Sequence, residues 1–226
     1  MTLKLFFGNI FFGACALLLA FLTSHIIDAL YRSRPDLIEW PLPSRSAVRA
    51  RVFLLWIGFL VSIKGIWHTD YISSNPPLFI FLLIAAILLL AMTATDIEQH
   101  LLFDALTAPL AIAGLLCAAC LALTTADVAS LLLSRALASL GGGILFLIIA
   151  ILTKGGIGGG DIKLIAALGL WLGAERLTTV IVIGLILGGM AAFVLLITGK
   201  KKRNDTFAYG PYFTIVALLS LIIYGL

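Results

Sequence analysis

The sequence predicts an all-α fold, a bundle of about seven or eight helices that cross a membrane. Two properties of the composition lead to this fold class: 62% of the 226 residues are apolar, and only 12% are charged. The mean hydropathy is +1.17, far above the values of soluble domains. The apolar residues also lie in long stretches separated by short polar segments, which is the pattern of a polytopic membrane protein.

Eight stretches are long and apolar enough to cross or nearly cross a bilayer. In chain order they lie at about 5–30, 52–67, 77–95, 105–124, 130–152, 162–174, 177–198 and 209–226. The first has no clear small-residue cleavage site, so we expect a retained helix and not a removed signal peptide. The longest polar stretch, 31–51, is too short to bury a core of its own. We therefore predict one membrane domain over residues 1–226.

Lysine and arginine predict the orientation of this bundle. With an external N-terminus and loops that alternate between the two sides, one side holds only Lys4, Lys64, Arg135 and Arg176, and the other holds the remaining eleven of the 15 basic residues. Basic residues in short loops favour the cytoplasm, so the richer side is predicted to be cytoplasmic. The net charge of +4 is thus a topology signal, and it predicts no nucleic-acid binding.

Two aspartates lie at the ends of apolar stretches that face the cytoplasm in this topology. Asp96 follows the stretch 77–95, and Asp161 precedes the stretch 162–174. They are therefore expected at one membrane face and at similar depth. Two carboxylates within hydrogen-bond range cannot both ionise cheaply, so one stays protonated near neutral pH. Such a pair can take a proton from water with one member and donate a proton to a peptide carbonyl with the other.

A run of glycines precedes Asp161. Five of the six residues from Gly155 to Gly160 are glycine, so we expect no helix to continue through them and a bare backbone that an extended peptide can approach. The residues alone leave a second interpretation open. An aspartate before a helix is commonly a cap or a favourable charge at the positive helix end, and Asp96 alone is compatible with an ordinary interfacial residue.

Three motifs resemble those of the type IV prepilin peptidases. In chain order they are Asp96-Ile97-Glu98 with Leu102, Asp104, Leu106 and Thr107, then Gly158-Gly159-Gly160-Asp161-Ile162-Lys163-Leu164, and finally Phe207-Ala208-Tyr209-Gly210-Pro211. They follow the family's order and spacing, and the resemblance covers about residues 77–226. It implies a Gly-x-Gly-Asp aspartyl protease in which Asp96 and Asp161 are the catalytic pair. The implied substrates are prepilin or pseudopilin precursors, cleaved on the cytoplasmic side after the glycine that ends a short basic leader.

The chain departs from the family pattern in two places. Phe103 stands where the family usually has proline before Asp104. The segment 31–51 contains no cysteine, whereas bifunctional members carry paired C-x-x-C motifs in a cytoplasmic insertion and also methylate the new N-terminus. We therefore expect residues 77–226 to form a catalytic core, residues 1–76 to be divergent, and methyltransferase activity to be missing.

The other polar residues receive weaker assignments. Glu98 and Asp104 are expected either to position the loop between them or to lie on solvated surface. Lys163 is expected to hold the aspartate loop, to bind lipid phosphate or to anchor the helix at the interface. Gly158 and Gly160 are expected to position the loop and the substrate. We predict no metal or cofactor, since the histidines are scattered and the C-x-x-C pair Cys117 and Cys120 lies in an apolar stretch.

Two classes of function follow. The first is a multi-pass aspartyl endopeptidase of the plasma membrane, with membrane lipid and pilus or secretion machinery as possible partners. The basic run Lys200–Arg203 lies where anionic lipid would be met. The second is a non-catalytic component such as a transporter or an assembly scaffold. A transporter should show internal repeats with paired broken helices, and only one glycine break is found.

Overall fold

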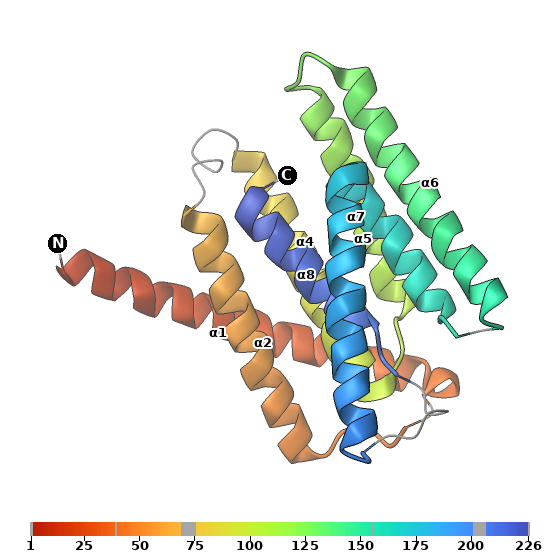
Figure 1. Ribbon diagram of the computed structural model, residues 1–226. Coiled ribbons are helices and arrows are strands. Elements are labelled where there is room, and N and C mark those ends of the chain that lie inside the picture. The colour runs from red at the N-terminus through yellow and green to blue at the C-terminus, as the bar shows by residue number, and fades with distance from the viewer. Residues whose placement is uncertain (1, 39, 69–75, 155, 201–206, 226) are drawn as a thin grey trace.

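The computed structural model describes residues 2–38, 40–68, 76–154, 156–200 and 207–225. The predicted all-α class is confirmed, because every regular element in these ranges is helical (Figure 1). The helices are α1 (Thr2–Ser33), the short 3-10 helix η1 (Pro35–Leu37), α2 (Arg45–His68), α4 (Pro76–Gln99), α5 (Asp104–Ala122), α6 (Val128–Leu152), α7 (Gly159–Ile197) and α8 (Gly210–Tyr224). Within the described ranges six of them are long and apolar enough to cross a membrane, and α8 is a shorter apolar helix.

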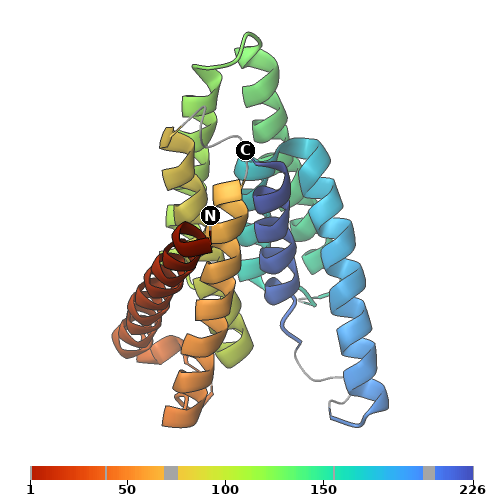
Figure 2. The same cartoon turned by 90° about the vertical axis from the view of Figure 1, so that its left-hand side faces the viewer.

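The helix α7 is a hairpin of two arms. Gly173 interrupts it with a φ of 72° and a ψ of 179°, a conformation that favours glycine because a Cβ would be strained there. A straight helix of 39 residues would be about 58 Å long, nearly twice the hydrocarbon core. Figure 2 shows instead that the chain reverses direction there. The two arms, residues 159–172 and 174–197, bring the number of long apolar segments to the predicted seven or eight.

A buried arginine stabilises the turn of this hairpin. The Arg135 guanidinium on α6 donates hydrogen bonds to the carbonyl oxygens of Leu170 and Trp171, at 2.8 and 2.7 Å. These carbonyls belong to the last turn of the first arm, where a helix has no backbone donors left to offer. The turn falls at Gly173 and not at 175–176, between the predicted stretches 162–174 and 177–198, because only glycine adopts the required positive φ without strain.

Two helix boundaries differ from the sequence prediction. The helix α2 begins at Arg45, inside the stretch 31–51 that we expected to be a connection. Ser44 explains the early start, because its hydroxyl accepts a hydrogen bond from the Ala47 N–H and its carbonyl accepts one from the Val48 N–H. The second difference is the C-terminal end of α4. This helix continues to Gln99, so Asp96 lies within the helix and not after it.

The core lies between α4, α5, α7 and α8, since α4 and α7 each pack against both α5 and α8. The largest fully buried side chains include Trp171, Phe213, Phe146, Leu89, Met92 and Leu168. The helices α1 and α2 pack against the side of α4, and α1 crosses the bundle at a steep tilt (Figure 1). Ion pairs and close packing, described below, join the ends of separate helices, and these ends lie at the lower end of the bundle in Figure 1. This end, which we call the site end, carries the last turns of α1 and α4 and the first turns of α2, α5, α7 and α8.

Candidate functional site

Asp96 lies in the last turn of α4 and faces the beginning of α8. Its side chain is buried, and the residue is only 5% exposed. The backbone N–H of Gly210, the first residue of α8, faces the Asp96 carboxylate. A Cβ added at Gly210 would collide with Oδ2 of Asp96 and would lie 3.0 Å from its Cγ. Glycine at this position therefore lets the N-terminus of α8 approach the carboxylate closely.

Asp161 lies in the first turn of α7. Gly158 is the N-cap, so Asp161 is the third residue of the helix. Its carboxylate reaches back to the N–H of Gly158, as the acidic residue of a capping box does. The capping interpretation of Asp161 thus describes its local geometry. In this geometry the Asp161 carboxylate lies at the positive end of the α7 helix dipole, where a negative charge is stabilised.

The fold brings these two aspartates to one place. The charge of Asp161 acts directly on Asp96, so the two carboxylates are within electrostatic range of each other. Leu102, in the connection between α4 and α5, lies close both to Gly160, next to Asp161, and to Gly210, beside Asp96. A Cβ at Gly160 would be 2.8 Å from the Leu102 Cβ, and a Cβ at Gly210 would be 3.3 Å from its Cδ1. The site is therefore assembled from α4, α7 and α8 around the 100–103 connection.

The glycine run is partly helical. Gly159 and Gly160 belong to the first turn of α7, so the expectation that no helix runs through the glycines is wrong for these two residues. Glycine is tolerated at these positions because the first N–H groups of a helix have no acceptor within it. Gly160 faces Leu102 at close range, which means that its small size serves helix-to-loop packing.

Glu98 points away from the aspartates and into a buried polar cluster. Its Oε2 accepts hydrogen bonds from the Arg51 guanidinium and the Tyr31 hydroxyl, both at 2.9 Å. Arg51 also pairs with Asp28 at 2.5 Å and bonds Ser24, and its side chain is only 2% exposed. The cluster joins α1, α2 and α4. Of the two sequence readings of Glu98, solvated surface is wrong, since it holds helices together.

Asp104 and Lys163 form an exposed ion pair. The Lys163 ammonium lies 2.7 and 2.8 Å from the two carboxylate oxygens of Asp104, and the side chains are 56% and 69% exposed. The pair connects the first residue of α5 to the first arm of α7. Exposed pairs contribute at most about 1 kcal/mol, so this contact orients the two segments and adds little stability.

Sequence reasoning missed three residues near the site. Gly210 was read only as part of a motif, although its close approach shapes the surroundings of Asp96. Arg51 was counted as a loop charge, whereas it is buried in α2. Gln99 belongs to none of the motifs, yet its side-chain nitrogen and oxygen are buried and find no partner in the part of the chain that the structure describes. The signal that could have revealed Gln99 is its spacing, since it lies one helical turn after Asp96.

Metal-ligating side chains do not cluster in the part of the chain described, where no three His, Cys, Asp or Glu side chains gather in a way that could hold an ion. The absence of a metal stays a prediction. Cys117 is buried in α5, and Cys15, Cys117 and Cys120 are all free thiols. The lipid-facing run that we expected at Lys200–Arg203 lies, apart from Lys200, outside the described residues.

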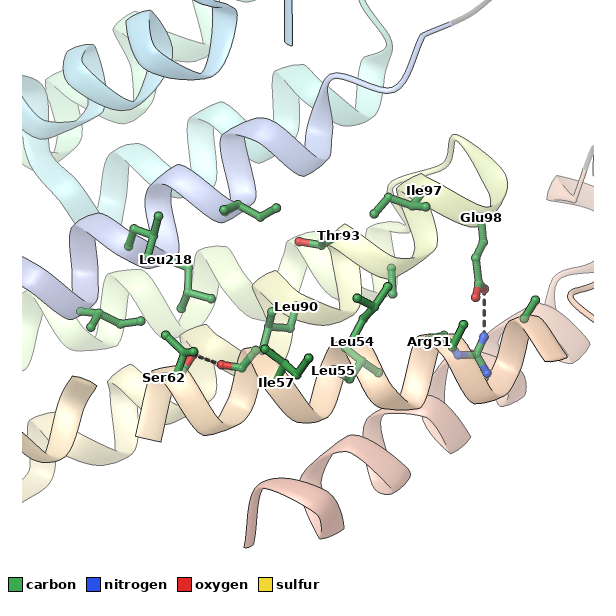
Figure 3. A pocket seen from close by; sticks show the side chains of 18 residues that line it. Arg51, Leu54, Leu55, Ile57, Ser62, Leu90, Thr93, Ile97, Glu98 and Leu218 are labelled. Carbon is green, nitrogen blue, oxygen red and sulfur yellow. Dashed lines mark hydrogen bonds and ion pairs between the residues drawn. The ribbon is translucent and has the colours of Figure 1, made fainter. Parts of the chain in front are cut away.

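An apolar groove of about 510 Å³ runs beside the site, between α2, α4 and α8 (Figure 3). Its walls include Leu54, Val61, Leu90, Leu218 and Ile222. At the site end it reaches Thr93, Ala94 and Ile97, on the α4 turn that carries Asp96, and it finishes at the Arg51–Glu98 pair. The hydroxyls of Thr93 and Thr214 are 2.7 Å apart and join α4 to α8 at this level.

Comparison with known proteins identifies relatives of this chain. The type IV leader peptidase family matches residues 83–195, which include both Asp96 and Asp161. A prepilin leader peptidase/N-methyltransferase from Burkholderia pseudomallei (strain 1026b) is 38% identical over 132 residues, covering 55% of this chain and 40% of the relative. Proteins of the same name from Legionella pneumophila and Aeromonas hydrophila are 29% identical over 163 residues and 32% identical over 138 residues.

These matches cover 72% and 59% of this chain, and 55% and 46% of the Legionella and Aeromonas proteins. The chain thus spans about half the length of the curated relatives it matches. No solved structure gives a significant match.

Proposed function

Because this chain belongs to the type IV leader peptidase family, we propose that it is a membrane aspartyl endopeptidase that removes the leader from prepilin-like precursors. The observation that carries the proposal is the placement of Asp96 and Asp161 at the site end, within electrostatic range of each other. Both aspartates lie within the family match, and both have a helix N-terminus beside the carboxylate. In this pair Asp96 is buried and Asp161 is partly buried. Two neighbouring carboxylates that share one proton are the arrangement that hydrolyses peptides without a metal.

The proposed chemistry assigns one proton to the pair. The ionised carboxylate accepts a proton from a water molecule, whose oxygen then bonds to the carbonyl carbon of the scissile peptide. The protonated carboxylate donates its proton to the carbonyl oxygen, which gives a neutral tetrahedral intermediate. When the intermediate collapses, the C–N bond breaks and the leaving nitrogen takes the proton that the first carboxylate removed from water. A hydroxyl of the intermediate returns a proton to the second carboxylate, so that a new carboxyl terminus and a new amino terminus are released and the pair is restored.

The groove supports a precursor that continues as a hydrophobic helix. It runs along α2 from Ala47 to Ser62, a rise of about 22 Å for an α-helix, which is most of the hydrocarbon core. Its polar groups are already satisfied, since the Ser62 hydroxyl donates to the Gly58 carbonyl and Thr93 bonds Leu89 and Thr214. An apolar segment lying there would leave no buried polar group without a partner.

The cytoplasmic location of the site is proposed from the distribution of basic residues. Arg32, Arg34, Arg45, Arg49 and Lys154 all belong to the site end or its connections, as the positive-inside rule requires. We also propose that this chain is a peptidase only. Its relatives are named for a second, N-methyltransferase activity, and the α1–α2 connection here lacks the paired cysteines of bifunctional members.

One assay tests the proposal. The purified full chain, in detergent or lipid, is incubated with a synthetic precursor that has a basic leader ending in glycine and then a hydrophobic helix. Sequencing of the new N-terminus should show a single cut after that glycine. An uncut precursor, with the chain folded and lipid present, would favour the non-catalytic scaffold instead.

A further inference from the structure

Gln99 carries a buried amide for which the described residues offer no hydrogen-bond partner. The residue is 4% exposed, and both its Nε2 and its Oε1 lack a hydrogen-bond partner among the described residues. A primary amide has two donors and an acceptor with two lone pairs. Leaving such a group dry and unpaired is unfavourable, and native proteins keep few of them. An unpaired amide in this position therefore requires an explanation other than the stability of the fold.

Its position relates it to Asp96. The two residues are three apart on α4, so their side chains lie on one face of the helix. Asp96 is similar, because its Oδ2 is also buried and has no hydrogen-bond partner within the described ranges. Both residues are covered to the same degree, at 5% and 4% exposure. A movement that uncovers Asp96 for a substrate on this face of α4 therefore also uncovers Gln99.

The unpaired groups match the chemistry of a peptide backbone. An extended substrate at the site brings its own N–H and C=O groups out of water, and each needs a partner. A glutamine amide can donate to a carbonyl and accept from an N–H of the same strand. We propose that Gln99 is a substrate-binding residue that hydrogen-bonds a backbone peptide group beside the scissile bond. This inference rests on the proposed function and adds to it a residue outside the aspartate pair.

The variant Gln99→Met tests the proposal because it keeps the length of the side chain and removes the amide. If the amide serves the substrate, cleavage of the synthetic precursor should fall about tenfold or more in kcat/KM. The melting temperature should rise by about 2–4 °C, because an unpaired buried polar group has been removed. A glutamine that only supports the fold would give a lower melting temperature.

Thr95→Val is the matched control. Thr95 is fully buried on the same turn, and its hydroxyl donates to the Met92 carbonyl of its own helix. This variant also removes a buried polar group, but one that is already satisfied, so kcat/KM should change less than twofold. An equal loss of activity in both variants would overturn the assignment of Gln99.

A second measurement uses the substrate. Precursors are made with an ester in place of one peptide bond at a time on either side of the cleavage point. At one position the ester should slow cleavage by the wild-type protein about tenfold. The same ester should not slow Gln99→Met further, since that variant has already lost the hydrogen bond that the ester removes. If no position is coupled to Gln99, or if Gln99→Met cleaves at the normal rate, the inference is wrong while the proposed function stands. If the unmodified chain does not cleave at all, both fall.

Discussion

At the scale of single residues, the site depends on which side chains α4 directs to its two faces. Asp96 and Glu98 are two residues apart, so they point in directions about 200° apart on the helix. Asp96 therefore meets α8 and the start of α7, and Glu98 meets Arg51 and Tyr31 on the opposite side. The two acids of this motif thus have separate roles. Asp96 is proposed to be catalytic, and Glu98 holds α4 to α1 and α2.

Asp96→Asn and Asp161→Asn are each expected to abolish cleavage of the precursor. An asparagine cannot exchange the proton that the proposed mechanism moves, although it keeps the shape of the side chain. Because the two residues act as one unit, the double variant should be no slower than either single variant. The rates are measured on protein that purifies in normal yield, and substantial turnover by a single variant would remove that aspartate from the mechanism.

Gly160→Val is expected to lose almost all activity. The added side chain would meet the Leu102 Cβ, which is 2.8 Å from an ideal Cβ at this position, and would move the first turn of α7 that carries Asp161. A displacement of about 1 Å can slow catalysis on the order of a hundredfold.

Gly141→Ala is the control for this substitution. An ideal Cβ at Gly141 has no neighbour within 4 Å, and alanine suits a helix interior, so the variant should retain most of its activity. Normal cleavage by Gly160→Val would show that the contact with Leu102 is dispensable.

At the scale of helices, the polar cluster around Arg51 joins the N-terminal pair α1 and α2 to the helix that carries Asp96. One guanidinium bonds Ser24 and Asp28 on α1 and Glu98 on α4. The family match begins at residue 83, within α4, so α1 and α2 lie outside it. The cluster therefore couples a part of the chain outside the match to the proposed site.

Arg51→Leu is expected to destabilise the protein by about 3–5 kcal/mol, because Asp28 and Glu98 would be left without their buried partner. Thermal unfolding of the purified chain measures this loss. Lys163→Ala provides the comparison, since it breaks an ion pair whose side chains are more than half exposed, and it should cost at most about 1 kcal/mol. A similar small change in both variants would mean that the Arg51 cluster does not hold α1 and α2 to α4.

At the scale of the whole molecule, the site end collects most of the charged residues, and the opposite end carries fewer, among them Arg135 and Arg176. The turn at Gly173 returns the second arm of α7 to this end, and α8 then begins beside Asp96. The hairpin is therefore what brings the third motif to the first two.

The whole chain is expected to cleave without methylating. The precursor is incubated with the chain and S-adenosylmethionine, and the product is examined by mass spectrometry. Its new N-terminus should carry no added methyl group, because the α1–α2 connection contains no cysteine pair. A product heavier by one methyl group would show that residues 1–76 retain the second activity.

The sequence by itself determined the fold class, the number of membrane segments and the common face of Asp96 and Asp161. These properties depend on hydropathy, segment length and the distribution of basic residues, all of which are properties of the linear sequence. Even there, local signals shifted some boundaries. The Ser44 cap starts α2 early, and the positive φ of Gly173 sets the turn of α7.

Only the tertiary structure decided which groups meet. The approach of Gly210 to Asp96, the pairing of Glu98 with Arg51 and the unpaired amide of Gln99 depend on how each helix is rotated and which helix it packs against. A change of one residue turns a side chain by about 100° on a helix, and the partner is supplied by a segment distant in the sequence. Contacts of this kind therefore follow from packing, which no local pattern of residues specifies.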